Sequence, residues 1–206
     1  GWVKIEPAKV NVTITGNKAE YEYDGTEKSV EGYEASYEDE LYSKDYIAIT
    51  GEAKATGTNV GEYPMGLEEE QFSNTNTNFD VTFVVNDGKL VIVDSEEKIT
   101  ITAASDEKTY DGKELTNSEY SVTGLPEGFT VEAVVTGGQT DVGTSANVVT
   151  EYKIKDSTGA EVTNYFPEVE VVNGTLTVTK RPVEVTITGN TVEYEYDGTE
   201  KSVEGY

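Results

Sequence analysis

The sequence predicts an all-β protein built from tandem modules, each of them an antiparallel β-sandwich. Residues 11–33 return almost unchanged at 184–206, and a weaker copy lies at 99–115. The shared Tyr-Asp-Gly sets the period, because 87 residues separate Tyr23 from Tyr110 and 86 separate Tyr110 from Tyr196. This period is too long for one turn of a solenoid and fits one small all-β domain. Short alternating runs, frequent Gly-containing turns and the lack of a sustained helical period favour a sandwich.

We expect three units along the chain: a first module at 1–97, a second module at 98–182 and the start of a third repeat at 183–206. Each complete unit is long enough to bury a modest core. The junctions at Lys98 and at Lys180–Pro182 are short, and the proline stiffens the second one. The sequence therefore predicts an extended array of modules.

Each unit opens with a strand in which apolar and polar residues alternate. The apolar positions are Val10, Val12 and Ile14, then Ile99 and Ile101, then Val183, Val185 and Ile187. A period of two is typical of a half-buried strand. A second strand at Glu20–Tyr23 runs into Asp24-Gly25, which predicts a type I′ turn with positive φ at both central residues.

The tripeptide Tyr-Asp-Gly occurs once in each unit and is the structural motif of the repeat. Its residues are Tyr23, Asp24, Gly25, Tyr110, Asp111, Gly112, Tyr196, Asp197 and Gly198. The tyrosine recurs in all three copies, whereas Lys108 replaces Tyr21 two positions earlier. We therefore expect the tyrosine of each motif to be a core residue.

The later part of each unit carries two further turn signals. Thr58–Gly61 is followed by Tyr63, a pattern similar to the tyrosine corner of immunoglobulin-like sandwiches, in which the phenol bonds to upstream backbone. The second unit has Ser145 at the position of Tyr63. Each unit then ends in apolar runs around Asn86–Gly88 or Asn173-Gly174, which predicts closing β-hairpins. The expected fold is a tandem of immunoglobulin-like antiparallel sandwiches.

Four tyrosines crowd the segment 33–46, and they are Tyr33, Tyr37, Tyr42 and Tyr46. Their spacing fits one face of a short helix, and strands around a turn fit equally well. As exposed rings they would be candidate ligand contacts that stack on sugars. As buried rings they would belong to the core, the commoner fate. A long helix packed across one sheet would indicate the alternative fold, a β-grasp-like module.

Charge and composition restrict the function further. The chain has 40 Asp and Glu against 15 Lys and Arg, and the formal charge of −25 repels the phosphates of nucleic acids. No apolar run approaches the ~20 residues of a spanning helix, so membrane insertion is not expected. The absence of Cys and His excludes disulfides, thiol catalysis and Ser-His-Asp catalysis. Carboxylate pairs remain, but none lies in an apolar context that would raise a pKa, so we predict no catalytic residues.

We predict no cofactor-binding and no metal-binding residues. Ca²⁺ is the ion that the abundant oxygen ligands would suit best, at Asp80, Asp87, Glu68–Glu70 and the loop Ser73–Asn78. No Asp-x-Asp-x-Asp-Gly loop occurs, so solvated loops are the favoured interpretation of these residues.

Turn and core residues of the first unit follow a recognisable order. They are Tyr23–Thr26, Gly32-Tyr33, Leu41-Tyr42, Gly57-Thr58, Met65–Leu67, Phe72, Asn78-Phe79 and Asp87-Gly88. The second unit keeps Tyr110–Gly112 and Asn164-Tyr165. In this order the chain resembles the tandem repeats of large bacterial cell-surface proteins known as MBG or YDG modules. These motifs are turn and core residues, so they identify a module and not a chemistry.

The resemblance implies a non-enzymatic stalk or spacer of an extracellular adhesin, anchored to the cell wall or secreted, on a bacterium of Gram-positive type. Its partners would be the neighbouring repeats of the same chain. The alternative is an adhesion module that binds a host glycan or protein through the tyrosine-rich segment 33–46. Residues 183–206 supply only opening strands, so we also expect self-association through them. They would replace residues 11–33 of another molecule by strand exchange, or else pair along an exposed sheet edge.

Overall fold

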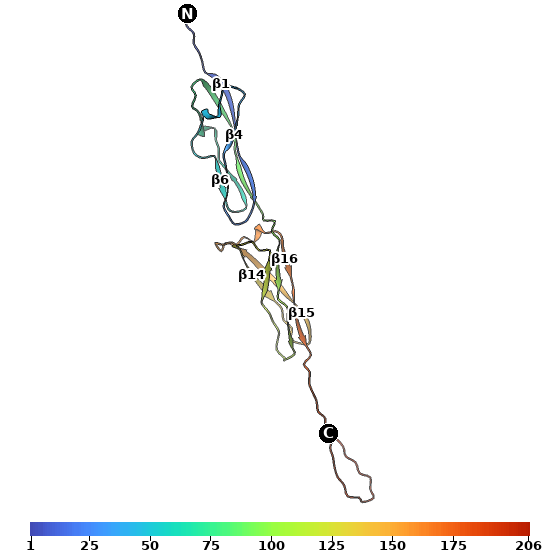
Figure 1. Ribbon diagram of the computed structural model, residues 1–206. Coiled ribbons are helices and arrows are strands. Elements are labelled where there is room, and N and C mark those ends of the chain that lie inside the picture. Colours follow the sequence, from blue (N-terminus) through green and yellow to red (C-terminus); the bar gives the residue numbers. More distant parts are fainter.

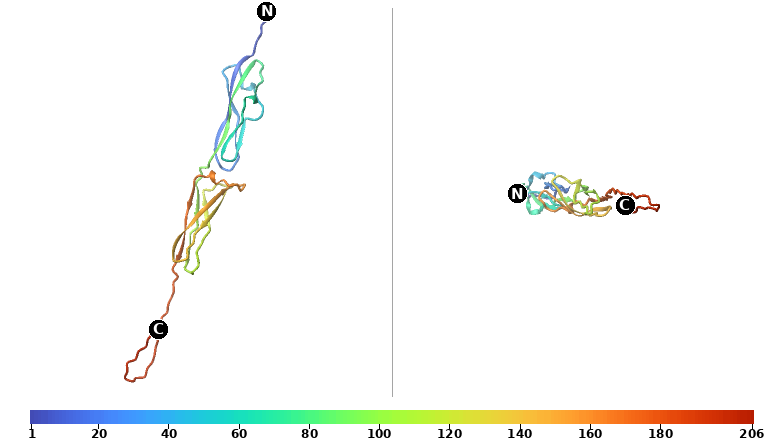
Figure 2. Two further views of the ribbon diagram at one scale, coloured as in Figure 1. Left: turned by 180° about the vertical axis from the view of Figure 1, so that it is seen from behind. Right: turned by 90° about the horizontal axis from the view of Figure 1, so that it is seen from below.

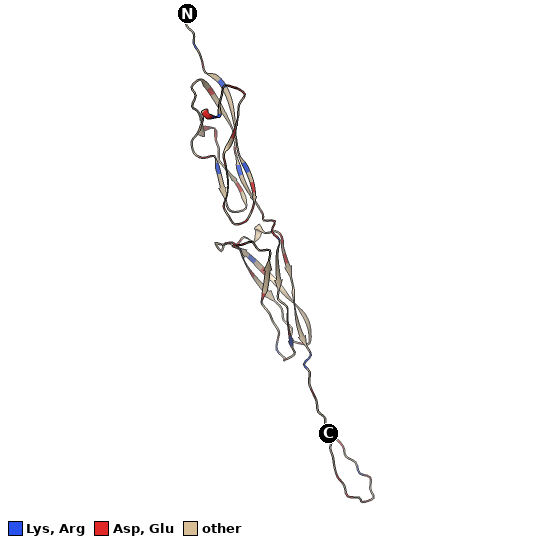
Figure 3. Cartoon of the chain, viewed as in Figure 1, with Lys and Arg blue, Asp and Glu red and all other residues tan.

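The computed structural model describes residues 1–206 and is all-β, with seventeen strands, three short 3₁₀ helices and no α-helix. The strands form two groups, β1–β10 and β11–β17, and no β-ladder joins one group to the other. We call these groups the first and the second module. Figures 1 and 2 show them end to end, as the short junctions predict. Acidic residues are scattered along both modules (Figure 3).

The first module contains ten strands in mixed sheets. They are β1 (Ala8–Gly16), β2 (Lys18–Glu22), β3 (Lys28–Glu31), β4 (Tyr33–Ser36), β5 (Ile47–Ile49), β6 (Lys54–Gly57), β7 (Gly61–Pro64), β8 (Phe72–Asn74), β9 (Phe79–Asn86) and β10 (Lys89–Val93), with the 3₁₀ helices η1 (Lys44–Tyr46) and η2 (Glu69–Gln71). One sheet has the order β4-β1-β9 and another the order β2-β10-β7. The pairs β3-β6 and β5-β8 complete the module.

The second module repeats this plan with seven strands. They are β11 (Ile99–Ala103), β12 (Asp106–Thr109), β13 (Tyr120–Thr123), β14 (Thr130–Thr136), β15 (Gly143–Lys155), β16 (Val169–Val172) and β17 (Gly174–Thr179), with η3 at Thr163–Tyr165. The sheet orders are β13-β11-β16 and β12-β17-β15-β14. The first residues of the long strand β15 pair with β17 and the later ones with β14.

The opening pair of strands of each module runs parallel to the closing pair. Both pairs pass from one sheet to the other at neighbouring points of their chains. β1 pairs in parallel with β9, and β2, which follows after Asn17, pairs in parallel with β10. β11 and β12 pair in the same way with β16 and β17. The predicted closing hairpins are therefore wrong. Asn86–Gly88 and Asn173-Gly174 are crossings between sheets, and the apolar runs on their two sides continue in one direction.

These crossings explain the glycines of the turn signals. A Cβ on Gly16 would lie 2.3 Å from the backbone nitrogen of Gly88, and one on Gly174 would lie 2.2 Å from the carbonyl oxygen of Ala104. Two neighbouring chains touch backbone to backbone there, and only glycine leaves room for that approach. In the first module the Asp87 carboxylate accepts hydrogen bonds from the amides of Gly66 and Leu67, at 3.1 and 2.9 Å.

The tyrosine-corner bond is confirmed in the first module. The Tyr63 hydroxyl donates to the carbonyl of Asn59 at 2.8 Å, and the ring covers Gly57, whose Cβ would lie 2.4 Å from it. In the second module, in which Gln139 takes the place of Gly57, the Ser145 hydroxyl donates to the carbonyl of Gly138 at 2.9 Å. The first module thus combines a large ring, Tyr63, with a glycine beneath it. The second module combines the small Ser145 with a full side chain, Gln139, at the position of that glycine.

Two further expectations need correction. Every residue with positive φ is a glycine, so Asp24-Gly25 does not form a type I′ turn, which needs positive φ at Asp24 as well. Of the two alternatives open for the segment 33–46, the helix with one aromatic face is wrong, because the segment forms strand β4, a loop and η1. No long helix packs across a sheet, which was the expected mark of the β-grasp alternative.

The alternating pattern predicts burial well where a partner strand is present. Val12 and Ile14 on β1 are fully buried, and so are Ile99 and Ile101 on β11. In the third copy Val183, Val185 and Ile187 are exposed, and residues 180–206 form no strand. They lack a counterpart of β9 to pair with, and they project beyond the second module as an open loop (Figure 1).

Candidate functional site at the module junction

The most elaborate contact of the molecule surrounds the first Tyr-Asp-Gly, at the junction of the two modules. Tyr23 follows β2, and its amide donates to the carbonyl of Val93 at 2.9 Å, which ties it to the end of β10. The ring itself leaves the first module. It packs edge to face against Phe129, Tyr165 and Phe166 of the second module, with centroid distances of 5.9, 4.8 and 5.9 Å. Such geometry adds about 0.5–1.5 kcal/mol per pair beyond the buried area.

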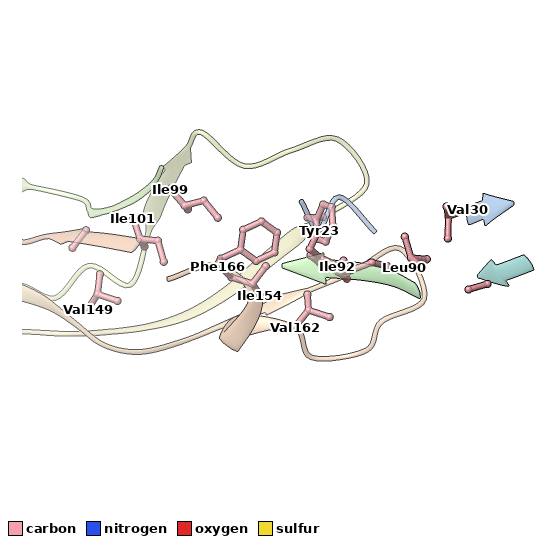
Figure 4. Close-up of a cluster of buried hydrophobic side chains, with 13 residues drawn as sticks. Tyr23, Val30, Leu90, Ile92, Ile99, Ile101, Val149, Ile154, Val162 and Phe166 are labelled. Atoms are coloured by element: carbon pink, nitrogen blue, oxygen red, sulfur yellow. The ribbon is translucent and has the colours of Figure 1, made fainter. Parts of the chain in front are cut away.

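The Tyr23 ring joins the cores of both modules into one cluster. Thirteen buried residues form this junction core. The first module contributes Tyr23, Val30, Ala55, Leu90 and Ile92, and the second contributes Ile99, Ile101, Ala103, Phe129, Val149, Ile154, Val162 and Phe166. Figure 4 shows the Tyr23 ring between Ile92 and Phe166, on the path from one set of side chains to the other. The two modules therefore share a packed apolar core and are not joined by a flexible linker alone.

The connecting segment is also held in place. Ser95 is buried, and its amide donates to the carbonyl of Tyr165 at 2.8 Å. The amide of Ile99 donates to the carbonyl of Glu168 at 3.0 Å, where β11 begins. These backbone bonds fix the linker against the same loop that supplies the aromatic rings.

The Asp-Gly half of the motif builds the turn that presents the ring. The Asp24 carboxylate accepts hydrogen bonds from the Thr26 amide and hydroxyl, at 2.9 and 2.6 Å, and from Lys28 Nζ at 2.5 Å. Partial burial alone would raise its pKa, but the bonds from Lys28 and Thr26 outweigh it and lower the pKa of Asp24 to about 2. Gly25 has φ +77°, and a Cβ there would lie 2.8 Å from Cζ of Phe129. The glycine thus serves both the turn and the approach of the next module.

The Tyr23 hydroxyl is buried at this junction without a hydrogen-bond partner. Burial, followed by the negative charges of Asp156, ionised Tyr165 and Asp24, raises the pKa of Tyr23 to about 12. A buried, unpartnered hydroxyl costs free energy. The junction is therefore built for apolar packing of the ring rather than for hydrogen bonding.

All three copies of the motif form the same turn, but they differ in how far the tyrosine ring is buried. Asp111 accepts from the Lys113 amide at 3.0 Å, and Asp197 accepts from the Thr199 amide at 3.0 Å, as Asp24 does from Thr26. The exposed fraction of the tyrosine, however, is 2% for Tyr23, 39% for Tyr110 and 97% for Tyr196. The expectation that all three are core residues is thus correct only for Tyr23. The reason is that the aromatic rings that bury Tyr23 belong to the following module.

Three of the four candidate ligand contacts, Tyr37, Tyr42 and Tyr46, pack on one another in the first module. Tyr42 is buried against Tyr37, Tyr46 and Phe79, with centroid distances of 5.0, 5.7 and 5.3 Å. Tyr33, Tyr37 and Tyr46 are partly buried against the core cluster that contains Tyr42. The seven residues of this cluster are Val10, Val12, Ile14, Tyr42, Leu67, Phe72 and Phe83. Tyr33 meets the edge of the Phe72 ring at 5.2 Å.

Two surface grooves include one of these tyrosines each. Tyr33 lines a groove between Glu31 and Lys54, and Tyr37 lines the other. The Tyr37 groove lies beside β1, and its other lining side chains are mostly polar or charged, among them Lys9, Thr13, Ser36, Glu38 and Asp39. The Tyr37 hydroxyl accepts from the Lys44 amide at 3.1 Å, and Lys44 Nζ lies 5.0 Å above the Tyr33 ring. The structure thus brings the four tyrosines together mainly as packing residues. Their role as ligand contacts stays a prediction.

Of the segments named for Ca²⁺, the loop Ser73–Asn78 uses its asparagine side chains in hydrogen bonds within the loop and to Phe79. Asn74 Nδ2 donates to the carbonyls of Asn76 and Phe79, at 2.7 and 2.9 Å, and the Asn78 amide donates to Asn76 Oδ1 at 3.1 Å. No three carboxylates gather in the geometry of a metal site. No helix is both long and apolar enough to cross a bilayer.

Comparison of the chain with protein-family models, with curated proteins and with solved structures finds no match. The junction is therefore interpreted from its own geometry.

Proposed function

We propose that this chain is a non-enzymatic spacer: a run of immunoglobulin-like modules from the stalk of an extracellular bacterial surface protein of the adhesin type. The junction core around Tyr23 is the observation that carries the proposal. A stalk must keep its modules in line, and a core shared by two modules does so better than a free linker. The repetition of the motif once per module supports the same function, since an array multiplies length.

Two features of the first module support the immunoglobulin-like assignment, and the first of them recurs in the second module. The opening strand divides between two sheets, with its second part parallel to the last strand, and Tyr63 makes the backbone bond of a tyrosine corner. The surface location and the Gram-positive type rest on the resemblance of the Tyr-Asp-Gly repeats to MBG or YDG modules.

Small-angle scattering on the chain and on the variant Tyr23→Ser tests the spacer. The parent chain should scatter as a stiff rod, whereas the variant should show the broader distance distribution of a hinged pair. Tyr110→Ser is the matched control, since its ring touches no following module, and it should keep the rod. A flexible parent chain, or a variant as stiff as the parent, would contradict the spacer.

A glycan array addresses the alternative function, binding through segment 33–46. The spacer predicts no saturable binding. Saturable binding that Tyr37→Ala weakens, while the melting temperature stays unchanged, would favour the adhesion module instead. Tyr37 suits this test better than Tyr42, because Tyr42 is a buried core residue.

A further inference from the structure

The end of the second module repeats the end of the first in detail. The Tyr110 amide donates to the carbonyl of Thr179 at 2.9 Å, as the Tyr23 amide does to Val93. Asp111 accepts from Lys108 Nζ at 2.8 Å and from the Lys113 amide. The turn that presents the ring is therefore already built at this end.

The two ends differ in what packs against the Tyr-Asp-Gly turn. The space where Gly112 would carry a Cβ is empty within 4 Å, whereas that of Gly25 meets Phe129. The core at this end is a separate cluster of three residues, Leu115, Leu176 and Val178. By register Leu176 and Val178 follow the crossing glycine as Leu90 and Ile92 do in the first module, and those two belong to the junction core of thirteen. This end is thus a junction with one side missing.

The opening end of a module carries the complementary rings. Phe79 lies four residues before Phe83, which pairs with Val12, and Tyr165 lies four residues before Val169, which pairs with Ile99. Val12 and Ile99 hold the same place in their units, so Phe79 of the first module corresponds to Tyr165 of the second. In the first module Tyr46 stacks on Phe79 at 6.2 Å, and both rings remain partly exposed.

We propose that the Tyr110 end of the second module is a docking surface for the opening, aromatic end of a further module of this type. That module is the one that residues 183–206 open, and it takes the Tyr110 ring as the second module takes Tyr23. This proposal rests on the spacer function. It adds the contact between the Tyr110 end of one module and the opening end of the next, by which the array is extended. Residues 184–206 match 11–33 at all but three positions. A module that continued this match would carry counterparts of Tyr42, Tyr46 and Phe79 at its opening end.

The test lengthens the chain in two independent ways. In one, residues 34–97 are appended after Tyr206, which completes a copy of the first module. In the other, a second copy of 98–182 follows Pro182, so that a module already folded in the parent chain stands at the new junction. Nitration of tyrosines by tetranitromethane is mapped by mass spectrometry, and hydrogen exchange reports whether the added module folds.

Tyr110 should be nitrated readily in the parent chain and lose this reactivity in both longer chains, down to the level of Tyr23 in the same molecule. Replacing the added copies of Phe129, Tyr165 and Phe166 by alanine should restore the reactivity of Tyr110. Val134→Ala in the added copy is the matched control, since Val134 is exposed, and it should leave Tyr110 protected.

Tyr110 that stays reactive beside two folded added modules would overturn the docking surface, and so would failure of both modules to fold at this end. Neither result touches the spacer itself, which depends on the Tyr23 junction in the parent chain and is measured by the scattering of Tyr23→Ser. The two proposals can therefore fail separately.

Discussion

The ring of Tyr23 meets the edge of the Tyr165 ring at a centroid distance of 4.8 Å, although 142 residues and a module boundary separate them in the chain. This contact makes the junction a piece of hydrophobic core. The two modules should consequently respond together when the junction is disturbed.

Tyr23→Ala should uncouple the modules. The parent chain should unfold in one cooperative transition in calorimetry, and the variant in two, because the cavity removes the packing that joins the two sets of core residues. The stability loss should be about 3–5 kcal/mol, the usual cost of removing a large buried aromatic side chain. Tyr110→Ala should cost about 1–2 kcal/mol, since less area is lost. Equal losses in the two variants would show that the neighbour does not matter.

Alkaline pH should weaken the junction. The pKa of Tyr23 is about 12 in the folded chain and 10.0 for ordinary tyrosine, so the unfolded chain loses this proton first. The contribution is therefore intact below pH 10 and is lost as the pH rises from 10 to 12. Urea unfolding between pH 9 and 11.5 measures it, with Tyr23→Phe as the control. Phenylalanine also removes the unpartnered hydroxyl, and at pH 7 it should stabilise the chain by about 1 kcal/mol. Parallel pH curves for the two proteins would contradict this prediction.

The glycines of the motif form a matched pair. Gly25 and Gly112 both have φ +77°, so alanine should cost about 1–2 kcal/mol of backbone strain at either position. Gly25→Ala should cost about 1–3 kcal/mol more, because its Cβ would collide with Phe129. The double variant Gly25→Ala/Phe129→Leu should remove most of that excess. Denaturant midpoints measure all three variants, and equal effects at the two glycines would refute the close approach.

Residues 183–206 should cause weak, concentration-dependent association. Val185 and Ile187 are exposed, whereas their counterparts Val12 and Ile14 are fully buried, so this segment can replace the same strand in another molecule. Sedimentation velocity should show association of the full chain and none of residues 1–182. Val185→Asp in the full chain should act like the truncation, because a carboxylate cannot enter that core. Association that survives both changes would rule out exchange through this segment.

The sequence predicts the β class and the opening strands because these depend on local patterns. Alternation places Val12 and Ile14 on a buried face, and the structure confirms it. The pattern around Asn173-Gly174 fails for a physical reason. Two apolar runs joined by a tight Gly segment fit a hairpin and a crossing between sheets equally well, and what decides is a partner strand about 70 residues away.

The candidate site was harder to predict than the fold. Recurrence identifies Tyr23 as important, but no local pattern tells whether its cover comes from its own module or from the next one. Asn147 gave no signal at all. It is fully buried in the second module, where its Nδ2 donates to the carbonyls of Ala104 and Asn117 at 2.9 and 2.8 Å. A single asparagine within a β-rich run does not reveal such a role.

The parallel pairing of the first and last strands has a mechanical consequence. Tension applied at the two ends of the array pulls the start of β1 one way and the end of β10 the other, along the direction of the strands. The ladder from Ala8 to Thr15 and the one from Lys18 to Glu22 are then loaded in shear, so their hydrogen bonds bear the force together instead of opening one by one. Each module is thereby arranged to resist extension at the strands through which the chain enters and leaves it.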